Sequence, residues 1–117
     1  KHCLAIILHV ARRGEWDKSK GKEEYRGDTL DSDGFIHCST PSQVIGVANA
    51  AHRGQNDLLL LCIDTTKVKQ QIKYEKSRTK LYPHIYGPLN VDAVLKVIEF
   101  KPGKDGTFVL PEGIPVG

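Results

Sequence analysis

Cysteine is scarce in this sequence of 117 residues. The three cysteines, Cys3, Cys38 and Cys62, lie far apart, so no pair has the short spacing of a zinc site. Their odd number leaves at least one thiol free, which argues against a disulfide-based fold and favours a reducing compartment. We therefore expect a cytoplasmic protein that requires no metal, disulfide or bound cofactor to fold.

Long hydrophobic runs are also missing, because no segment approaches the ~18 apolar residues that a membrane-spanning helix needs. The apolar segment near the N-terminus is short and is interrupted by His9, and it lacks a small-residue cleavage pattern before Arg12 and Arg13. We interpret Leu4–Val10 as a buried strand and not as a signal peptide, and we expect no association with membranes.

A large excess of one charge is absent as well, since the formal net charge is only +3. One stretch is nevertheless basic, and its cations surround a single acid, Glu75; they are Lys67, Lys69, Lys73, Lys76, Arg78 and Lys80. Such a stretch indicates either a solvated lysine-rich surface or a patch that attracts phosphates. Only Tyr74 and Tyr82 interleave aromatic rings with it, so the pattern supports nucleic-acid binding weakly. Nothing in the charge pattern predicts an oligomeric state.

The hydrophobic pattern predicts one α+β domain over residues 1–117, with a core over about 4–110 and a tail, 111–117, that frays. Strands are expected at Leu4–Val10, Gly34–Cys38, Leu58–Ile63, Ile72–Glu75, Val94–Phe100 and Phe108–Leu110. A short helix is expected over Ala11–Lys20, a long loop over Gly21–Asp33 and a second helix after Thr40. The unbroken apolar run of Leu58–Ile63 is typical of a central strand covered on both faces. Because the second half lacks crossover helices, the order of elements favours α+β over a doubly wound sheet.

The second helix has the clearest signal in the chain. Thr40 is a natural N-cap, Pro41 suits the first helical position and Gln43 completes a Thr-x-x-Gln capping box. Apolar residues then recur at helical spacing, and Gly54 is placed to end the helix.

A first polar cluster, Asp33–Thr40, reads Asp-Gly-Phe-Ile-His-Cys-Ser-Thr. Strand alternation places Phe35 and His37 together on one face. Ser39 and Thr40 lie where the strand meets the helix, whose free N–H groups and positive dipole end favour an anion such as phosphate. The alternative is that Ser39 and Thr40 only cap the helix, while His37 is a hydrogen-bonded core histidine.

A second polar cluster, Tyr82–Leu89, reads Tyr-Pro-His-Ile-Tyr-Gly-Pro-Leu. Two prolines and a glycine argue against both a helix and a central strand, so we expect a loop. His84 and Tyr86 in such a loop can line a pocket, where the rings stack on a flat ligand and the polar tips orient it. The alternative is a rigid surface turn that buried aromatic rings anchor.

Between the clusters, Glu75 and Arg78 form a third candidate pair. Opposite charges around Glu75 should keep its carboxylate ionised. An ionised Glu75 suits a hydrogen bond to a ribose hydroxyl or the stabilisation of a developing cation, and Arg78 suits a phosphate. The alternative for both residues is a surface ion pair.

Together these segments resemble a family catalogued as domain of unknown function 952. The resemblance rests on Asp33–Thr40 followed by a helix with Gln43, and on Tyr74–Arg78 followed by Tyr82–Leu89, in matching order and spacing. It covers most of the chain, over about residues 6–100.

That family is grouped by fold with ADP-ribosyltransferase-like proteins. The grouping implies a curved, split, mixed or antiparallel α+β sheet with a cleft for NAD or ADP-ribose. By this resemblance, His9 contacts the adenosine-side ribose, and the strand from Gly34 to Thr40 lines the nicotinamide pocket. A later glutamate, for which Glu75 is the candidate, activates the nicotinamide ribose for transfer.

Three functions therefore stay open. The first is an ADP-ribosyltransferase-like or degenerate enzyme, in which Glu75 stabilises an oxocarbenium-like state. The second is acid–base phosphoester chemistry by His37 and His84, and the third is a non-catalytic module that binds a nucleotide or a partner through the Lys67–Lys80 surface. The predicted catalytic residues are His37, Glu75 and His84, and the predicted ligand-binding residues are His9, Gly34, Phe35, Ser39, Thr40, Arg78, Tyr86 and Gly87.

Overall fold

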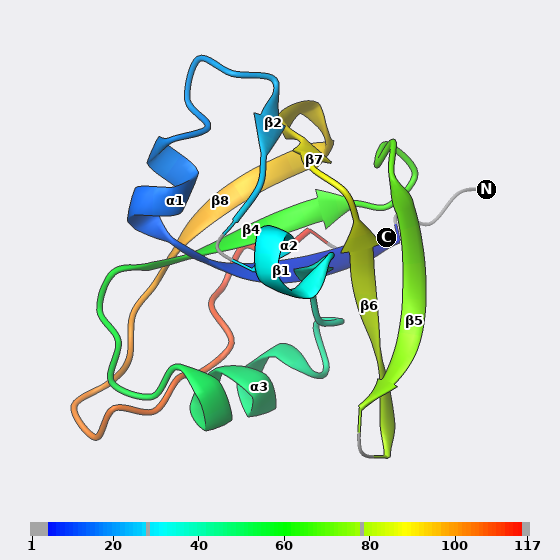
Figure 1. The fold of residues 1–117 in the computed structure, drawn as a ribbon. Helices are drawn as coiled ribbons and strands as arrows, with labels where there is room; N and C mark the ends of the chain where they lie inside the picture. The colour runs from blue at the N-terminus through cyan, green and yellow to red at the C-terminus, as the bar shows by residue number, and fades with distance from the viewer. Residues whose placement is uncertain (1–4, 28, 78, 116–117) are drawn as a thin grey trace.

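The computed structural model describes residues 5–27, 29–77 and 79–115. Over these residues the chain has an α+β fold, with three short sheets and a few short helices (Figure 1). The strands are β1 (Ile6–Arg12), β2 (Glu24–Tyr25), β3 (Ile36–His37), β4 (Leu58–Asp64), β5 (Gln71–Ser77), β6 (Lys80–Tyr86), β7 (Leu89–Asn90) and β8 (Val94–Phe100). The helices are α1 (Arg13–Asp17), α2 (Leu30–Asp33), α3 (Val44–Ala51) and the 3-10 turn η1 (Val91–Ala93). No helix in the described part of the chain is long and apolar enough to span a membrane.

The first sheet has the order β1-β4-β8, so β4 lies in its centre, as predicted. Every residue of β4 is buried, because a hydrophobic core lies on each face of the strand. Leu61 and Ile63 contribute to one core, whereas Leu60 and Cys62 contribute to the other, as strand alternation requires.

The second large sheet has the order β3-β6-β5 and stands to one side of the first (Figure 1). Among the described residues, one isolated bridge links the two sheets: Leu8 of β1 and Ser39 exchange two backbone hydrogen bonds of 2.7 Å. All pairings between the described strands are antiparallel. The expected α+β fold is therefore present, with antiparallel sheets over the described residues.

The prediction of a loop over Tyr82–Leu89 is wrong, because residues 82–86 belong to β6 and Leu89 belongs to β7. The Pro83 carbonyl accepts a hydrogen bond of 3.0 Å from the N–H of Cys38, just after β3 ends. The N–H and C=O of one strand residue point to the same side, so the N–H that proline lacks would also face β3. The pairing of β6 with β5 on the other side therefore stays complete, with Tyr74 opposite Pro83.

Three boundaries in the first third of the chain also differ from prediction. The helix expected over Ala11–Lys20 is only Arg13–Asp17, because β1 continues along β4 as far as Arg12. The segment Gly21–Asp33 is not structureless, since it contains β2 and α2. Gly34 does not begin a strand: with φ of +85° it ends α2, donating its N–H to the carbonyl of Leu30.

The helix α3 begins four residues after the predicted cap. Half of the expected capping box forms, since the Thr40 N–H donates to Gln43 Oε1 at 3.1 Å. The hydroxyl of Thr40 instead pairs with that of Ser42, so residues 41–43 form a turn ahead of the helix. Val44 and Ala48 are the buried positions of α3, and they belong to the same core as Leu8.

The strand predicted at Phe108–Leu110 does not form. The turn at Asp105 and Gly106 is present, but the chain then packs against α3. The N–H of Phe108 donates to Asn49 Oδ1 of α3, and the Phe108 ring stacks on Phe100 with centroids 4.6 Å apart.

Candidate functional site

A hollow of about 820 Å³ lies beside the junction of the two large sheets. Its floor comes from β1 and from the segment around β3, and its walls come from α3 and from the turn end of the β5–β6 hairpin. In Figure 1, α3 lies below β1, and the lower end of the hairpin lies to its right. The side chains that line the hollow therefore come from segments far apart in the sequence.

The two polar clusters of the sequence meet in this hollow. His37 of β3 and His84 of β6 are direct cross-strand partners, and both line the hollow. The hydrogen bond between Cys38 and Pro83 makes the neighbouring His37–His84 pair a non-hydrogen-bonded one, in which side chains approach most closely. The ring centroids lie 5.3 Å apart.

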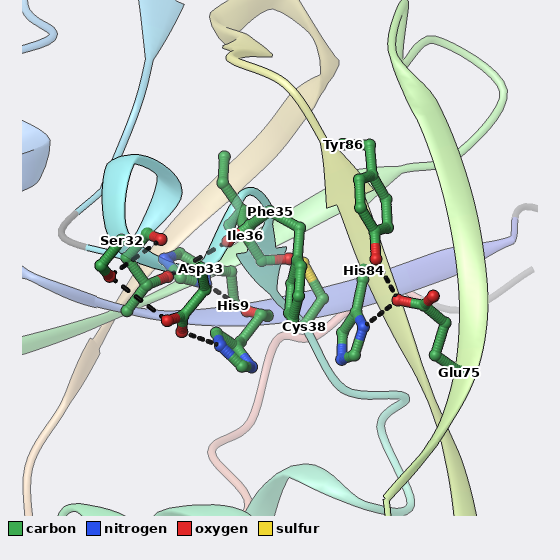
Figure 2. Close-up of polar contacts among 11 residues, drawn as sticks. His9, Ser32, Asp33, Phe35, Ile36, Cys38, Glu75, His84 and Tyr86 are labelled. Carbon is green, nitrogen blue, oxygen red and sulfur yellow. Dashed lines mark hydrogen bonds and ion pairs between the residues drawn. The ribbon is translucent and has the colours of Figure 1, made fainter.

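His84 is held by a carboxylate behind it. Its Nδ1 lies 2.7 Å from Oε1 of Glu75, and the hydroxyl of Tyr86 donates to the same oxygen (Figure 2). An ionised carboxylate only accepts hydrogen bonds, so Nδ1 donates, and Nε2 makes no hydrogen bond to the described residues. The ring of Phe35 stacks on His84 with centroids 4.0 Å apart. His84 is thus fixed in both position and tautomer, with 8% of the residue exposed.

His37 has a carboxylate of its own. Its Nε2 lies 2.8 Å from Oδ2 of Asp33, and about half of its side chain is exposed. The hydrogen bond from His37 lowers the pKa of Asp33, so that carboxylate stays ionised at neutral pH. The hollow therefore contains two facing imidazoles, each oriented by a separate acid.

His9 lines the hollow but has both ring nitrogens engaged within the protein. Its Nδ1 donates to the carbonyl of His37 at 2.6 Å, and its Nε2 lies 2.8 Å from the hydroxyl of the buried Tyr25. A ligand can reach the ring of His9 but finds no unengaged nitrogen there. The arrangement suits His9 to position the backbone of His37.

Glu75 and Tyr86 lie on the far side of His84 and are not among the residues that line the hollow. The hydrogen bond from Tyr86, followed by that from His84, lowers the pKa of Glu75, while the bond to Glu75 raises the pKa of Tyr86. Lys73 lies 4.8 Å above the Tyr86 ring and adds positive charge. Glu75 is therefore placed to orient His84 and not to touch a ligand in the hollow.

Of the remaining predicted site residues, some line the hollow and others do not. Phe35 and Ser39 line the hollow, but Gly34, Thr40 and Gly87 are not among its lining residues. Gly87 has a φ of +145°, and a Cβ there would lie 2.6 Å from the side chain of Gln70, so its role is in the turn after β6. The predicted phosphate ligand Arg78 lies outside the described residues.

Cys38 also lines the hollow, but its thiol is a poor nucleophile. Burial raises the pKa of Cys38, so the reactive thiolate is suppressed. Within the described ranges, no group of three or more His, Cys, Asp or Glu side chains is arranged to hold a metal ion.

Two parts of the wall were not among the predicted site residues, although Lys76 and Lys80 belong to the basic stretch noted in the sequence. The hairpin end contributes Lys76, Ser77, Thr79 and Lys80. The outer face of α3 contributes Gly46, Val47, Ala50 and Ala51. The basic stretch of the sequence could have indicated the lysines, whereas no sequence pattern marks small exposed residues on a helix as part of a site.

Glu75→Gln is expected to lower stability at neutral pH and to have little effect in strong acid. The pKa of Glu75 is lower in the folded protein than its ordinary value of 4.5. The stabilisation from its charge is therefore present above that value and is lost as the pH falls through the folded-state pKa. Urea unfolding of both proteins across this range measures the difference, with the exposed Glu112→Gln as a control. A difference that does not change with pH would contradict a role for the charge.

Comparison with solved structures finds protein CC0527 from Caulobacter crescentus. Its crystal structure matches with a TM-score of 0.82 and 33% identity, covering 91% of this chain and 95% of that one. Its solution NMR structure matches with a TM-score of 0.77 and 34% identity, covering 90% and 92%. A search of curated proteins finds no match. A family model described as a protein of unknown function, DUF952, matches residues 10–97, and the chain therefore belongs to the DUF952 family.

Proposed function

We propose that the hollow binds a phosphorylated nucleotide of the NAD or ADP-ribose type and presents it to His84. The observation that carries this proposal is that four imidazoles and two lysines line one hollow: His9, His37, His52, His84, Lys76 and Lys80. Its volume of about 820 Å³ suits a ligand of this size. Cations favour the phosphates, and the aromatic and imidazole rings favour the flat parts of the ligand.

The fold lends further support to an ADP-ribosyltransferase-like assignment. The motif resemblance implies a split sheet with a cleft, and the antiparallel sheets here have a hollow beside their junction. In such a reaction the bond between the anomeric carbon and its leaving group breaks, and the ribose gains positive charge. Glu75 acts in this proposal as a positioning residue, because it reaches the hollow only through His84.

Ligand binding is expected to raise the melting temperature of the protein. With free NAD or ADP-ribose about 100-fold above its Kd, linkage predicts a rise on the order of 10 °C. Differential scanning fluorimetry at millimolar ligand measures this rise, with ribose as the control that lacks phosphate. A folded protein whose melting temperature does not respond to either nucleotide would contradict the proposal.

A second candidate function is favoured by the facing imidazoles. His37 and His84 are cross-strand partners with a separate carboxylate each, an arrangement suited to one general base and one general acid. On a 2′,3′-cyclic phosphodiester, one imidazole takes a proton from water as its oxygen attacks phosphorus. The other gives a proton to the ribose oxygen that leaves, and the product is a phosphomonoester.

A further inference from the structure

We propose that the hollow binds the 3′ end of a single-stranded RNA whose terminal phosphate is a 2′,3′-cyclic diester. This inference rests on the acid–base reaction of His37 and His84 proposed above as the second candidate function, and it adds the class of substrate. The terminal nucleoside lies against the ring of Tyr82, and the phosphate on its 5′ side lies at Lys76 and Lys80.

The charge of the hollow favours a ligand with more than one anionic group. Lys76 and Lys80 line it together with four histidines, and no Asp or Glu is among the described residues that line it. Neither lysine pairs with an acid in the described part of the chain, in contrast to Lys18, which pairs with Glu15. Two cations without an acidic partner there favour a phosphate.

The order of side chains along β6 places an aromatic ring between the imidazole pair and these cations. His84, Tyr82 and Lys80 all line the hollow, and strand alternation points them to the same face. At roughly 3.3 Å per residue, the Cα atoms of His84 and Lys80 lie about 13 Å apart. A phosphate between the imidazoles and a phosphate at Lys80 are therefore two separate groups, with Tyr82 between them.

This order matches one repeat of a nucleic-acid strand, which is phosphate, nucleoside and phosphate. Proteins bind single strands by combining a positively charged groove with aromatic rings on which bases stack. Tyr82 lines the hollow for this purpose, whereas Tyr74, the other tyrosine of the basic stretch, is 51% exposed and is not among the lining residues. The strand is RNA, because a 2′,3′-cyclic diester requires the 2′ oxygen.

The reaction at this RNA end is the addition of water across one P–O bond of the cyclic diester. One imidazole takes a proton from water as the water oxygen bonds to phosphorus. The other imidazole gives a proton to the ribose oxygen that leaves. The RNA keeps its length and ends in a phosphomonoester, so no oxidant or reductant enters the balance.

The test compares adenosine 2′,3′-cyclic phosphate with a dinucleotide of two adenosines that ends in the same cyclic phosphate. Wild-type kcat/KM should be at least about tenfold higher for the dinucleotide, because its internal phosphate meets the two lysines. Higher salt should reduce this advantage, since contacts between cations and phosphates weaken with salt. Faster hydrolysis of the mononucleotide that carries a free 5′-phosphate than of the dinucleotide would overturn the assignment to RNA.

Lys80→Gln tests the contact with the internal phosphate. It should remove most of the advantage of the dinucleotide, whereas Lys69→Gln should keep that advantage. Lys69 is the matched control, because it is exposed, belongs to the same basic stretch and is not among the lining residues. Both variants lose the same charge, so an equal effect of the two would overturn a local contact at Lys80.

Tyr82→Leu and Tyr82→Phe test the ring. Tyr82→Leu keeps an apolar side chain but loses base stacking, so kcat/KM for the dinucleotide should fall about tenfold. Tyr82→Phe keeps the ring and should keep most of the rate. Urea unfolding checks that both variants fold, and a folded Tyr82→Leu with the wild-type rate would overturn the role of the ring.

The same rates separate this inference from the reaction on which it rests. Wild-type protein that hydrolyses neither the mononucleotide nor the dinucleotide would overturn the acid–base reaction and this inference with it. If the wild type hydrolyses both with equal kcat/KM, the inference fails while the acid–base reaction stands.

Discussion

Replacing Phe100 with alanine is expected to lower the free energy of unfolding by about 3–5 kcal/mol. Phe100 is 1% exposed, ends β8 opposite Leu58 and stacks on Phe108. Removing the ring leaves a cavity in the core that also contains the buried face of α3. Because domains of this size are stable by only about 5–15 kcal/mol, the loss is a large share of the total.

Urea unfolding followed by fluorescence of the single tryptophan, Trp16, measures this loss. The tryptophan lies beside Tyr25, with ring centroids 5.7 Å apart, so its emission should report on the packed state. Val109→Ala is the control, because Val109 is 78% exposed and its truncation should change stability by less than about 0.5 kcal/mol. Equal effects of the two changes would show that the Phe100 core does not support the fold as described.

For the phosphodiester reaction, His84→Ala and His37→Ala are each expected to lower kcat by at least about 100-fold. A positioned general acid or base contributes about 100- to 10,000-fold to a rate. The double variant should be little slower than either single variant, because the two imidazoles act as a unit. Hydrolysis of a 2′,3′-cyclic nucleotide, followed by chromatography, measures the rates.

Another histidine, His52, provides the control for this experiment. His52 lines the same hollow, but its Nδ1 bonds to the amide oxygen of Gln55 and not to a carboxylate. His52→Ala should therefore keep most of the rate. The wild-type rate should also be bell-shaped in pH, since one imidazole must be neutral and the other protonated. A rate that survives in both His84→Ala and His37→Ala would exclude the acid–base pair.

The centre of the fold could be predicted because short sequence patterns, each within a few consecutive residues, determine the elements there. The apolar run of Leu58–Ile63 predicted the central strand, and alternation correctly placed Phe35 and His37 on one face. Thr40 and Gln43 correctly predicted a helix but not its first residue. The Thr40 hydroxyl had an equally close partner in Ser42, and the sequence does not show which partner is chosen.

The supporting groups of the site were harder to predict, because they depend on strand register. Because Pro83 argued against a strand, β6 was not predicted from the sequence. Nothing therefore indicated that Glu75, His84 and Tyr86 share one face of a hairpin. The role of Glu75 behind His84 follows from that register alone.

The spacing of the two imidazoles has a consequence for protein engineering. His37 and His84 face each other because the backbones of β3 and β6 pair, and only two residues of β3 are needed for this. The geometry of this imidazole pair can therefore be transferred to another antiparallel hairpin. A designed antiparallel hairpin with two histidines at one non-hydrogen-bonded pair, and an acid beside each, should reproduce the distance between the rings without the rest of this domain.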